Sequence, residues 1–305
     1  MKFFNFAKRI TLFLMVNILV MVTLTLILQL TGLDKRFPPG SYQNLMIFCL
    51  VWGMGGAFIS LALSRMMAKW MMGVRLIPEN TPDPNLRELV RLVHELAQRA
   101  RLPRMPEVGI YESDEINAFA TGPTKSRSLV AVSTGLLRRM NRREIEGVLA
   151  HEVAHIANGD MVTMTLVQGV INAFVMFLAR VLAFAVMAAL KSRDSGRGGY
   201  WMQFMLVQLF QIVLSLLGSI VVCWFSRFRE FRADAGGAAL ASRDSMAAAL
   251  RALQRFYGQH AHPEAQTGGA AFQSLKISGK AGGLARLFAT HPPLEERIAR
   301  LEGIG

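Results

Sequence analysis

Apolar residues in this chain are gathered into long blocks that alternate with polar stretches. Residues 10–30 carry no charged side chain and match the roughly 20 residues that a helix needs to cross the hydrocarbon core of a bilayer. A cleaved signal peptide has a shorter apolar core, of about 7–15 residues. Residues 42–64 form a second block after a short, Pro-containing connection. The pattern therefore predicts a first transmembrane hairpin within residues 1–65.

Two further apolar blocks lie at residues 161–190 and 201–225, separated by a polar, Gly-rich connection. Each is long enough to cross a bilayer as a helix. We therefore expect a second transmembrane hairpin within residues 161–225, and four spanning helices in all.

The polar segment at residues 66–160 has the patterns of a globular domain. Residues 85–102 repeat apolar side chains at three- and four-residue steps, which is typical of an amphipathic helix. Three short β-rich stretches separated by turn residues follow, at 107–111, 117–121 and 128–133. Asn141 with Glu144 three residues on forms a capping box. The helix that it opens is predicted to end at Asn158-Gly159, a typical C-terminal stop.

The second polar segment, residues 226–305, is also predicted to be mostly helical. An Ala- and Arg-rich helix is expected to about residue 257, and a terminal amphipathic helix after Pro293. Together with the small sheet, these elements predict a mainly helical α+β fold class.

Charge changes the picture mainly through the orientation that it predicts. The chain has 34 Lys and Arg against 21 Asp and Glu, a formal charge of +13. No nucleic-acid recognition module is present, and many basic residues flank the apolar blocks, so we expect no nucleic-acid partner. Basic clusters mark the cytoplasmic side of membrane proteins. Those at residues 2–9 and 65–75 place both polar segments there, although three basic residues in the 191–199 connection oppose this.

The sharpest motif in the chain is the HEVAH run at His151, Glu152 and His155. Residues four apart share one face of a helix, so both imidazoles can reach a single metal ion. Glu152 lies one step round the helix, where it can take a proton from the hydrolytic water. A second run begins in the same way at His94, but Gln98 stands at its second histidine position. His94 is therefore interpreted as an ordinary helix residue.

A catalytic zinc usually takes three protein ligands. Glu230 in the run REFRAD is the best candidate for the third, and Asp234, one helical turn on, would orient a ligand histidine. Taken alone, this run could equally be a solvated charged helix. The point halfway between His155 and Glu230 falls in the 191–199 connection, so an antiparallel hairpin centred there returns Glu230 to the height of His155.

HEVAH, a membrane hairpin and then EFRAD, in this order, resemble the integral-membrane gluzincin peptidases of the bacterial heat-shock type. The resemblance covers essentially the whole chain. It implies one Zn²⁺ per chain held by His151, His155 and Glu230, with Glu152 as general base and Asp234 orienting a ligand.

The resemblance also implies a zincin-like metallopeptidase domain, formed from residues 66–160 and 226–305, that faces the cytoplasm from the bacterial inner membrane. Stress-related quality control of damaged or misfolded membrane proteins is the role that it implies. Protein substrates and the lipid bilayer are then the expected partners, whereas the sequence does not indicate an oligomeric state.

Two weaker matches concern substrate binding. Asn117, Ala118 and Phe119 resemble the family's edge strand, whose free backbone groups could align an extended substrate, although a plain core-edge strand remains an alternative. His291 resembles a histidine that the family keeps near the site, where it could stabilise an oxyanion; as a lone histidine before Pro292 it could equally cap a turn.

Two other functions fit the sequence less well than peptide hydrolysis. A membrane scaffold with a structural zinc site would have no use for a base such as Glu152. A transporter would need ionisable residues along the path of its substrate through the membrane. The apolar blocks carry almost none, with Arg180 as the exception. Cys49 and Cys223 lie inside these blocks and are predicted to be packing residues.

Overall fold

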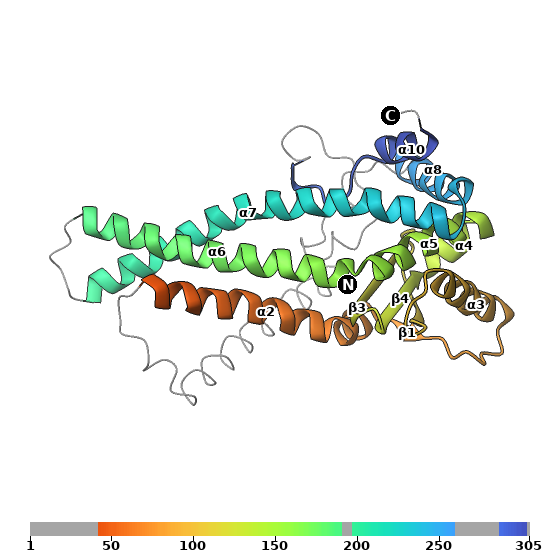
Figure 1. Ribbon diagram of the computed structural model, residues 1–305, viewed down its shortest axis with the longest axis horizontal. Helices are drawn as coiled ribbons and strands as arrows, with labels where there is room; N and C mark the ends of the chain where they lie inside the picture. Colours follow the sequence, from red (N-terminus) through yellow and green to blue (C-terminus); the bar gives the residue numbers. More distant parts are fainter. Residues whose placement is uncertain (1–41, 191–196, 260–286, 304–305) are drawn as a thin grey trace. The chain divides into compact units, whose positions relative to one another are not determined.

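The computed structural model describes residues 42–190, 197–259 and 287–303 (Figure 1). The predicted span at residues 10–30 lies outside the described residues. Contacts divide the chain into two units. We call the first the helical unit, with Met164–Val222 and the described residues up to Ser60, and the second the α+β unit, with Leu61–Thr163 and the described residues from Cys223 on.

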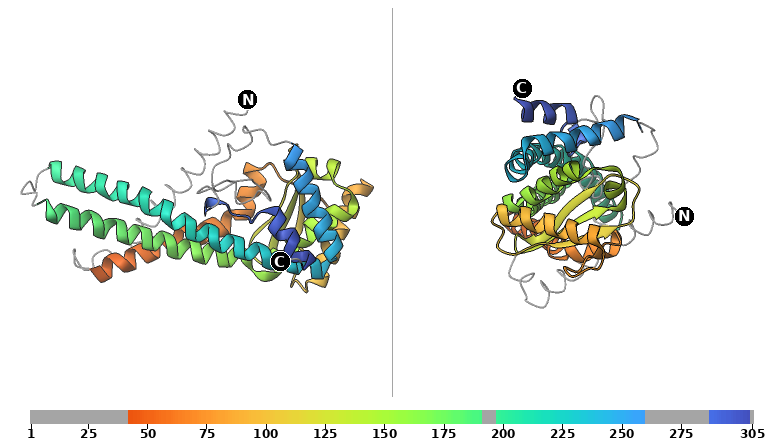
Figure 2. Two further views of the ribbon diagram at one scale, coloured as in Figure 1. Left: turned by 90° about the horizontal axis from the view of Figure 1, so that it is seen from above. Right: turned by 90° about the vertical axis from the view of Figure 1, so that its right-hand side faces the viewer.

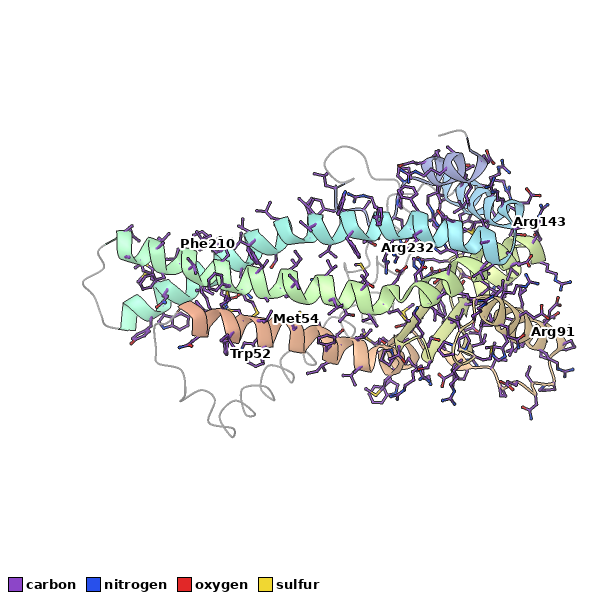
Figure 3. The ribbon with its side chains drawn as sticks, in the orientation of Figure 1. Trp52, Met54, Arg91, Arg143, Phe210 and Arg232 are labelled. Carbon is purple, nitrogen blue, oxygen red and sulfur yellow. The ribbon has the colours of Figure 1, made fainter. Side chains whose placement is uncertain are left out.

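Three helices of the described chain are long and apolar enough to cross a membrane. They are α2 (Tyr42–Met71), α6 (Asp160–Ala189) and α7 (Arg197–Leu240). In the helical unit α2 approaches α6 closely at Gly53. A Cβ added to this residue would lie only 2.5 Å from the backbone nitrogen of Ala173, so the contact needs a glycine. Met54, labelled in Figure 3, likewise fits against Gly169 of α6. Small residues at such contacts are typical of packed membrane helices.

The small sheet of the α+β unit has the strand order β1-β2-β4-β3. Its strands are β1 (Arg75–Leu76), β2 (Glu107–Tyr111), β3 (Ala118–Thr124) and β4 (Arg127–Ser133). Strands β2 and β4 are parallel, and the other pairs are antiparallel. This confirms the three β-rich stretches of the sequence.

Both faces of the sheet are covered. Successive side chains of β4 point to opposite faces, and those of residues 128–133 are all buried. Val130 and Val132 pack with helices α3 (Pro84–Arg99) and α5 (Arg142–Asn158) in the larger core. Leu129 and Ala131 point the other way, into a smaller cluster that includes Ala68 of α2. The right-hand view of Figure 2 shows the helices around the sheet.

Helix α5 has the predicted ends. The Asn141 side chain accepts from the Glu144 amide while the Glu144 side chain accepts from the Asn141 amide, which completes the capping box. Gly159 ends the helix with φ 73°, a left-handed conformation that glycine adopts at little cost.

The expected single helix from 226 to about 257 is wrong. Helix α7 continues through this region to Leu240, and α8 (Arg243–Gln259) begins after a break. The physical reason is Ser242, whose hydroxyl accepts from the amide of Ser245 and so caps a new helix. A short helix, α4 (Thr134–Arg139), was not predicted, and α10 (Leu294–Glu302) follows Pro293 as expected.

Candidate active site

Helix α5 carries His151, Glu152 and His155 into the interior of the α+β unit. His151 and Glu152 are 3% and 6% exposed, and the His155 side chain is 11% exposed. The four-residue spacing turns both imidazoles the same way, and their Nε2 atoms lie 3.1 Å apart. Two ring nitrogens this close together can both bind a single metal ion.

Helix α7 brings Glu230 to the same point. Its Oε2 lies 3.3 Å from His151 Nε2, and its Oε1 lies 3.3 Å from His155 Nε2. The three residues form the only group of three or more potential metal ligands found in the described chain. The HEVAH motif and Glu230 thus lie together, as their spacing about the 191–199 connection predicted.

The three side chains fit a metal ion. Tetrahedral zinc with bonds of about 2.0–2.2 Å separates neighbouring ligand atoms by about 3.3–3.6 Å, near the 3.1–3.3 Å between these donors. Glu230 is fully buried, and neither carboxylate oxygen makes a hydrogen bond of good geometry within the described residues. The nearest guanidinium groups are those of Arg229 and Arg297, at 3.7 and 3.8 Å. Burying a carboxylate is costly unless cations neutralise it, and a metal ion between Glu230 and the two imidazoles would add to that neutralisation.

Each imidazole is held from behind by an acidic side chain. His151 Nδ1 lies 3.0 Å from Asp234 Oδ1, the contact expected for Asp234. His155 Nδ1 lies 2.6 Å from Oδ2 of Asp160, which the sequence analysis missed. The available signal was an acidic residue directly after the Gly159 helix stop, but that position is also an ordinary place for a helix-opening acid.

Arg297 of α10 was also missed. It is fully buried, and its guanidinium donates from Nε and Nη2 to both oxygens of Asp234, at 2.8 and 2.6 Å. The same Nη2 lies 3.8 Å from Glu230 Oε2. In the sequence Arg297 is one of several charged residues in an amphipathic helix, so no local pattern distinguishes it.

Glu152 is anchored to the edge of the sheet. Its Oε2 accepts from the Ala120 amide at 2.8 Å. Because the Ser133 amide donates to the Asn117 carbonyl, Asn117 turns its backbone to β4, and alternate residues Ala118 and Ala120 turn theirs outward. Within the described sheet β3 is an edge strand, as expected.

The side chains predicted for substrate binding are less open than expected. Asn117, Ala118 and Phe119 are each at most 5% exposed, so their side chains are covered by the protein. His291 does lie at the site: its Nδ1 is 2.8 Å from Glu230 Oε2. His94 lies elsewhere, with Nε2 3.1 Å from the Pro106 carbonyl, in agreement with the interpretation that it is not a ligand.

The acidic surroundings change the protonation of the imidazoles. Burial by itself lowers the pKa of His151, but the contacts with the Asp234 and Glu230 carboxylates outweigh it and raise the pKa to about 9. Burial likewise opposes the charged form of His155, while Glu230 and Asp160 raise its pKa. A metal ion must therefore displace protons when it binds.

Comparison with known proteins identifies the arrangement. The sequence profile described as peptidase family M48 matches residues 84–304. A protein named Protease HtpX homolog from Methylacidiphilum infernorum is 50% identical over 301 residues, covering 97% of this chain and 99% of that protein. Protease HtpX from Idiomarina loihiensis is 48% identical over 299 residues, with the same coverage. The chain belongs to peptidase family M48.

The fold of this M48 chain also resembles a solved structure. The crystal structure of S. mikatae Ste24p superposes with a TM-score of 0.57 at 19% identity, covering 94% of this chain and 66% of the other. At that identity the likeness concerns the fold alone.

M48 membership and the three apolar helices together establish the coarse function. The protein is a membrane-associated metallopeptidase that uses a metal cofactor and acts on protein substrates in a lipid environment. It is an HtpX-type protease, as the resemblance in its motifs implied.

Proposed function

We propose that this M48 peptidase is a zinc-dependent endopeptidase that hydrolyses damaged or misfolded membrane proteins in stress-related quality control. His151, His155 and Glu230 would hold one zinc ion. The observation that carries the proposal is the cluster of three donors, in which the buried Glu230 carboxylate lies 3.3 Å from the Nε2 atoms of both imidazoles. A small set of nitrogen and oxygen donors of this kind suits zinc.

Glu152 acts as the general base. A zinc ion held by these ligands would lower the pKa of the hydrolytic water and stabilise negative charge on the substrate carbonyl oxygen. Glu152 takes the water proton and later delivers it to the leaving amine. Its Oε2 is held by the Ala120 amide of β3, so the carboxylate lies beside the two ligand histidines of the same helix without being a ligand.

The edge strand is proposed to align the substrate. Ala118 and Ala120 turn their backbone groups away from β4, so an extended peptide could add beside β3 and pass Glu152. In this proposal Asn117, Ala118 and Phe119 contribute backbone position rather than side-chain contacts, since these side chains are buried. His291, 2.8 Å from Glu230, is proposed to stand beside the developing oxyanion.

The proposed topology has four spanning helices, with a first hairpin in residues 1–65 and a second in 161–225. Residues 66–160 and 226–305 form the metallopeptidase domain on the cytoplasmic side of the bacterial inner membrane. The basic clusters near the amino terminus and at residues 65–75 support this orientation.

The deciding experiment replaces the base alone. Glu152→Gln keeps the size of the side chain and the three ligands, so purified protein should still bind about one zinc, while cleavage of an unfolded membrane protein should fall at least ~100-fold. Glu146→Gln, on the same helix, is the control and should keep full activity. Cleavage by Glu152→Gln at the original rate would exclude the mechanism even if zinc were bound.

A further inference from the structure

Asp160 is a fully buried acid whose two oxygens serve different partners. It is the first residue of α6, directly after the glycine that ends α5. Oδ2 lies 2.6 Å from His155 Nδ1, and Oδ1 accepts from Arg232 Nη2 at 2.5 Å. Arg232 comes from α7, two residues after Glu230 (Figure 3).

The contact with His155 determines which ring nitrogen is available. A neutral imidazole has one N–H and one lone pair. When Nδ1–H donates to Asp160, the lone pair is on Nε2, and this is the atom that lies 3.3 Å from Glu230 and 3.1 Å from His151 Nε2. Hydrogen bonding to a carboxylate also makes the imidazole a stronger ligand.

The same order of side chains occurs behind both imidazoles. Arg297 holds Asp234 against His151, and Arg232 holds Asp160 against His155. Helix α7 contributes to both sets, with Asp234 to one and Arg232 to the other. Their partners come from different elements, since Arg297 lies on α10 and Asp160 on α6. Asp160 is thus the counterpart of Asp234 for the other histidine, although it belongs to no part of the EFRAD run.

We propose that Asp160 is a positioning residue that fixes the orientation and tautomer of His155, and that Arg232 acts through Asp160 by holding its carboxylate. The inference rests on the proposed function, because a fixed tautomer matters only if His155 binds a metal ion. It assigns to the opening residue of α6 a direct effect on the metal site, beyond the capping role that an acid at this position ordinarily has.

The exposed pair Asp244–Arg143 provides a matched control. Asp244 is likewise an acid in the first turn of its helix, α8, and Arg143 Nη2 lies 2.8 Å from its Oδ2. Its side chain is 80% exposed and is not part of the metal-ligand group. Loss of a helix-opening acid should affect both sites alike, whereas loss of histidine positioning should affect Asp160 alone.

The test uses the full chain in detergent, freed of metal and titrated with zinc against a chelator of known affinity. Asp160→Asn should weaken zinc affinity roughly 10- to 100-fold, as Asp234→Asn should, and should alter the visible spectrum of the cobalt-substituted protein. Asp244→Asn should change neither. Adding Arg232→Met to Asp160→Asn should cause no further loss, because Arg232 acts through Asp160.

Unchanged zinc affinity and an unchanged cobalt spectrum in folded Asp160→Asn would overturn the inference. If that variant does not fold, Arg232→Met decides: weakened zinc binding supports the inference, and full affinity overturns it. Absence of zinc binding by the unaltered protein would instead reject the proposed function, so the two failures are distinguishable.

Discussion

At the scale of single residues, the site is a group of buried charges that neutralise one another. Glu230 and Asp234 are at most 3% exposed, and the fully buried Arg297 lies between them. Buried ionic groups are tolerated when each is paired, and removal of one partner leaves another uncompensated. The chemistry and the stability of this site therefore depend on the same side chains.

Glu230→Ala tests the third ligand. Two imidazoles alone should hold the metal poorly, so zinc affinity should fall by more than the roughly 10- to 100-fold that follows loss of an outer partner, and activity should disappear. Elemental analysis of the purified variant measures the bound zinc. Stoichiometric zinc would show that the ligand lies elsewhere, and Glu112→Ala, an exposed residue, should bind zinc normally.

At the scale of elements, two consecutive glycines allow α7 to approach α5 at the site. A Cβ on Gly236 would lie 2.9 Å from Ala154 Cβ, and one on Gly237 would lie 3.0 Å from the His151 backbone nitrogen. The distance between Glu230 and the imidazoles therefore depends on the absence of side chains about two turns further along α7.

Gly237→Val should separate the two helices. Overpacking at such a contact destabilises a protein by about 1–3 kcal/mol, and the displaced Glu230 should bind zinc more weakly. Thermal unfolding and zinc titration measure the two effects. Gly56→Val is the control, because a Cβ at Gly56 meets nothing within 4 Å. Equal effects of both substitutions would contradict close packing at Gly237.

Glu107 joins the end of α2 to β2. Arg65 and Lys69, on successive turns of α2, both form ion pairs with its carboxylate. Burial alone would raise the pKa of Glu107, but hydrogen bonds and charge from these two residues lower it. The ionised carboxylate therefore stabilises the fold above its ordinary pKa of 4.5, and this stabilisation is lost as pH falls through the lower folded value.

Glu107→Gln should consequently lower the melting temperature at neutral pH, and the difference from the unaltered protein should vanish in acid. Melting curves across pH measure this dependence. Glu95→Gln breaks the exposed pair with Arg91 and should have a smaller effect at neutral pH. A difference that persisted in strong acid would mean that packing, rather than charge, accounts for the loss.

At the scale of the whole molecule, the metal ligands come from two segments of the chain that are separated in the sequence by residues of the helical unit. The α+β unit contains Leu61–Thr163 and then resumes at Cys223, and Met164–Val222 belongs to the helical unit. A proposed membrane hairpin is thus inserted between the second histidine and Glu230, and the orientation of this hairpin determines which compartment supplies the substrates.

Cysteine labelling in intact cells tests the orientation. Cys49→Ala and Cys223→Ser give a cysteine-free background, and serine can keep the hydrogen bond from Cys223 to the Phe288 carbonyl. A cysteine at Ser192 should react with an impermeant reagent from the periplasmic side, whereas one at Ser278 should react only after lysis. Labelling of both in intact cells would reverse the proposed orientation.

Local features of the sequence were sufficient for much of this protein. The ends of α5 follow from Asn141, Glu144 and Gly159, because caps satisfy backbone groups within a few residues. The shared face of His151 and His155 follows from helix geometry alone. The break at Ser242 also has a local cause, but without tertiary context a serine in an Ala-rich run is compatible with an unbroken helix.

What the sequence by itself determined is the three long apolar helices of the described chain, the helix with the HEVAH motif and the pairing of that motif with Glu230, since each depends on periodicity, length or spacing along the chain. Only the tertiary structure decided that Asp160 holds His155 and that Arg297 holds Asp234. The local sequence around a charged residue is the same whether its side chain faces water or pairs with a residue far along the chain. Burial and contact distance distinguish these cases, and both are properties of the folded protein.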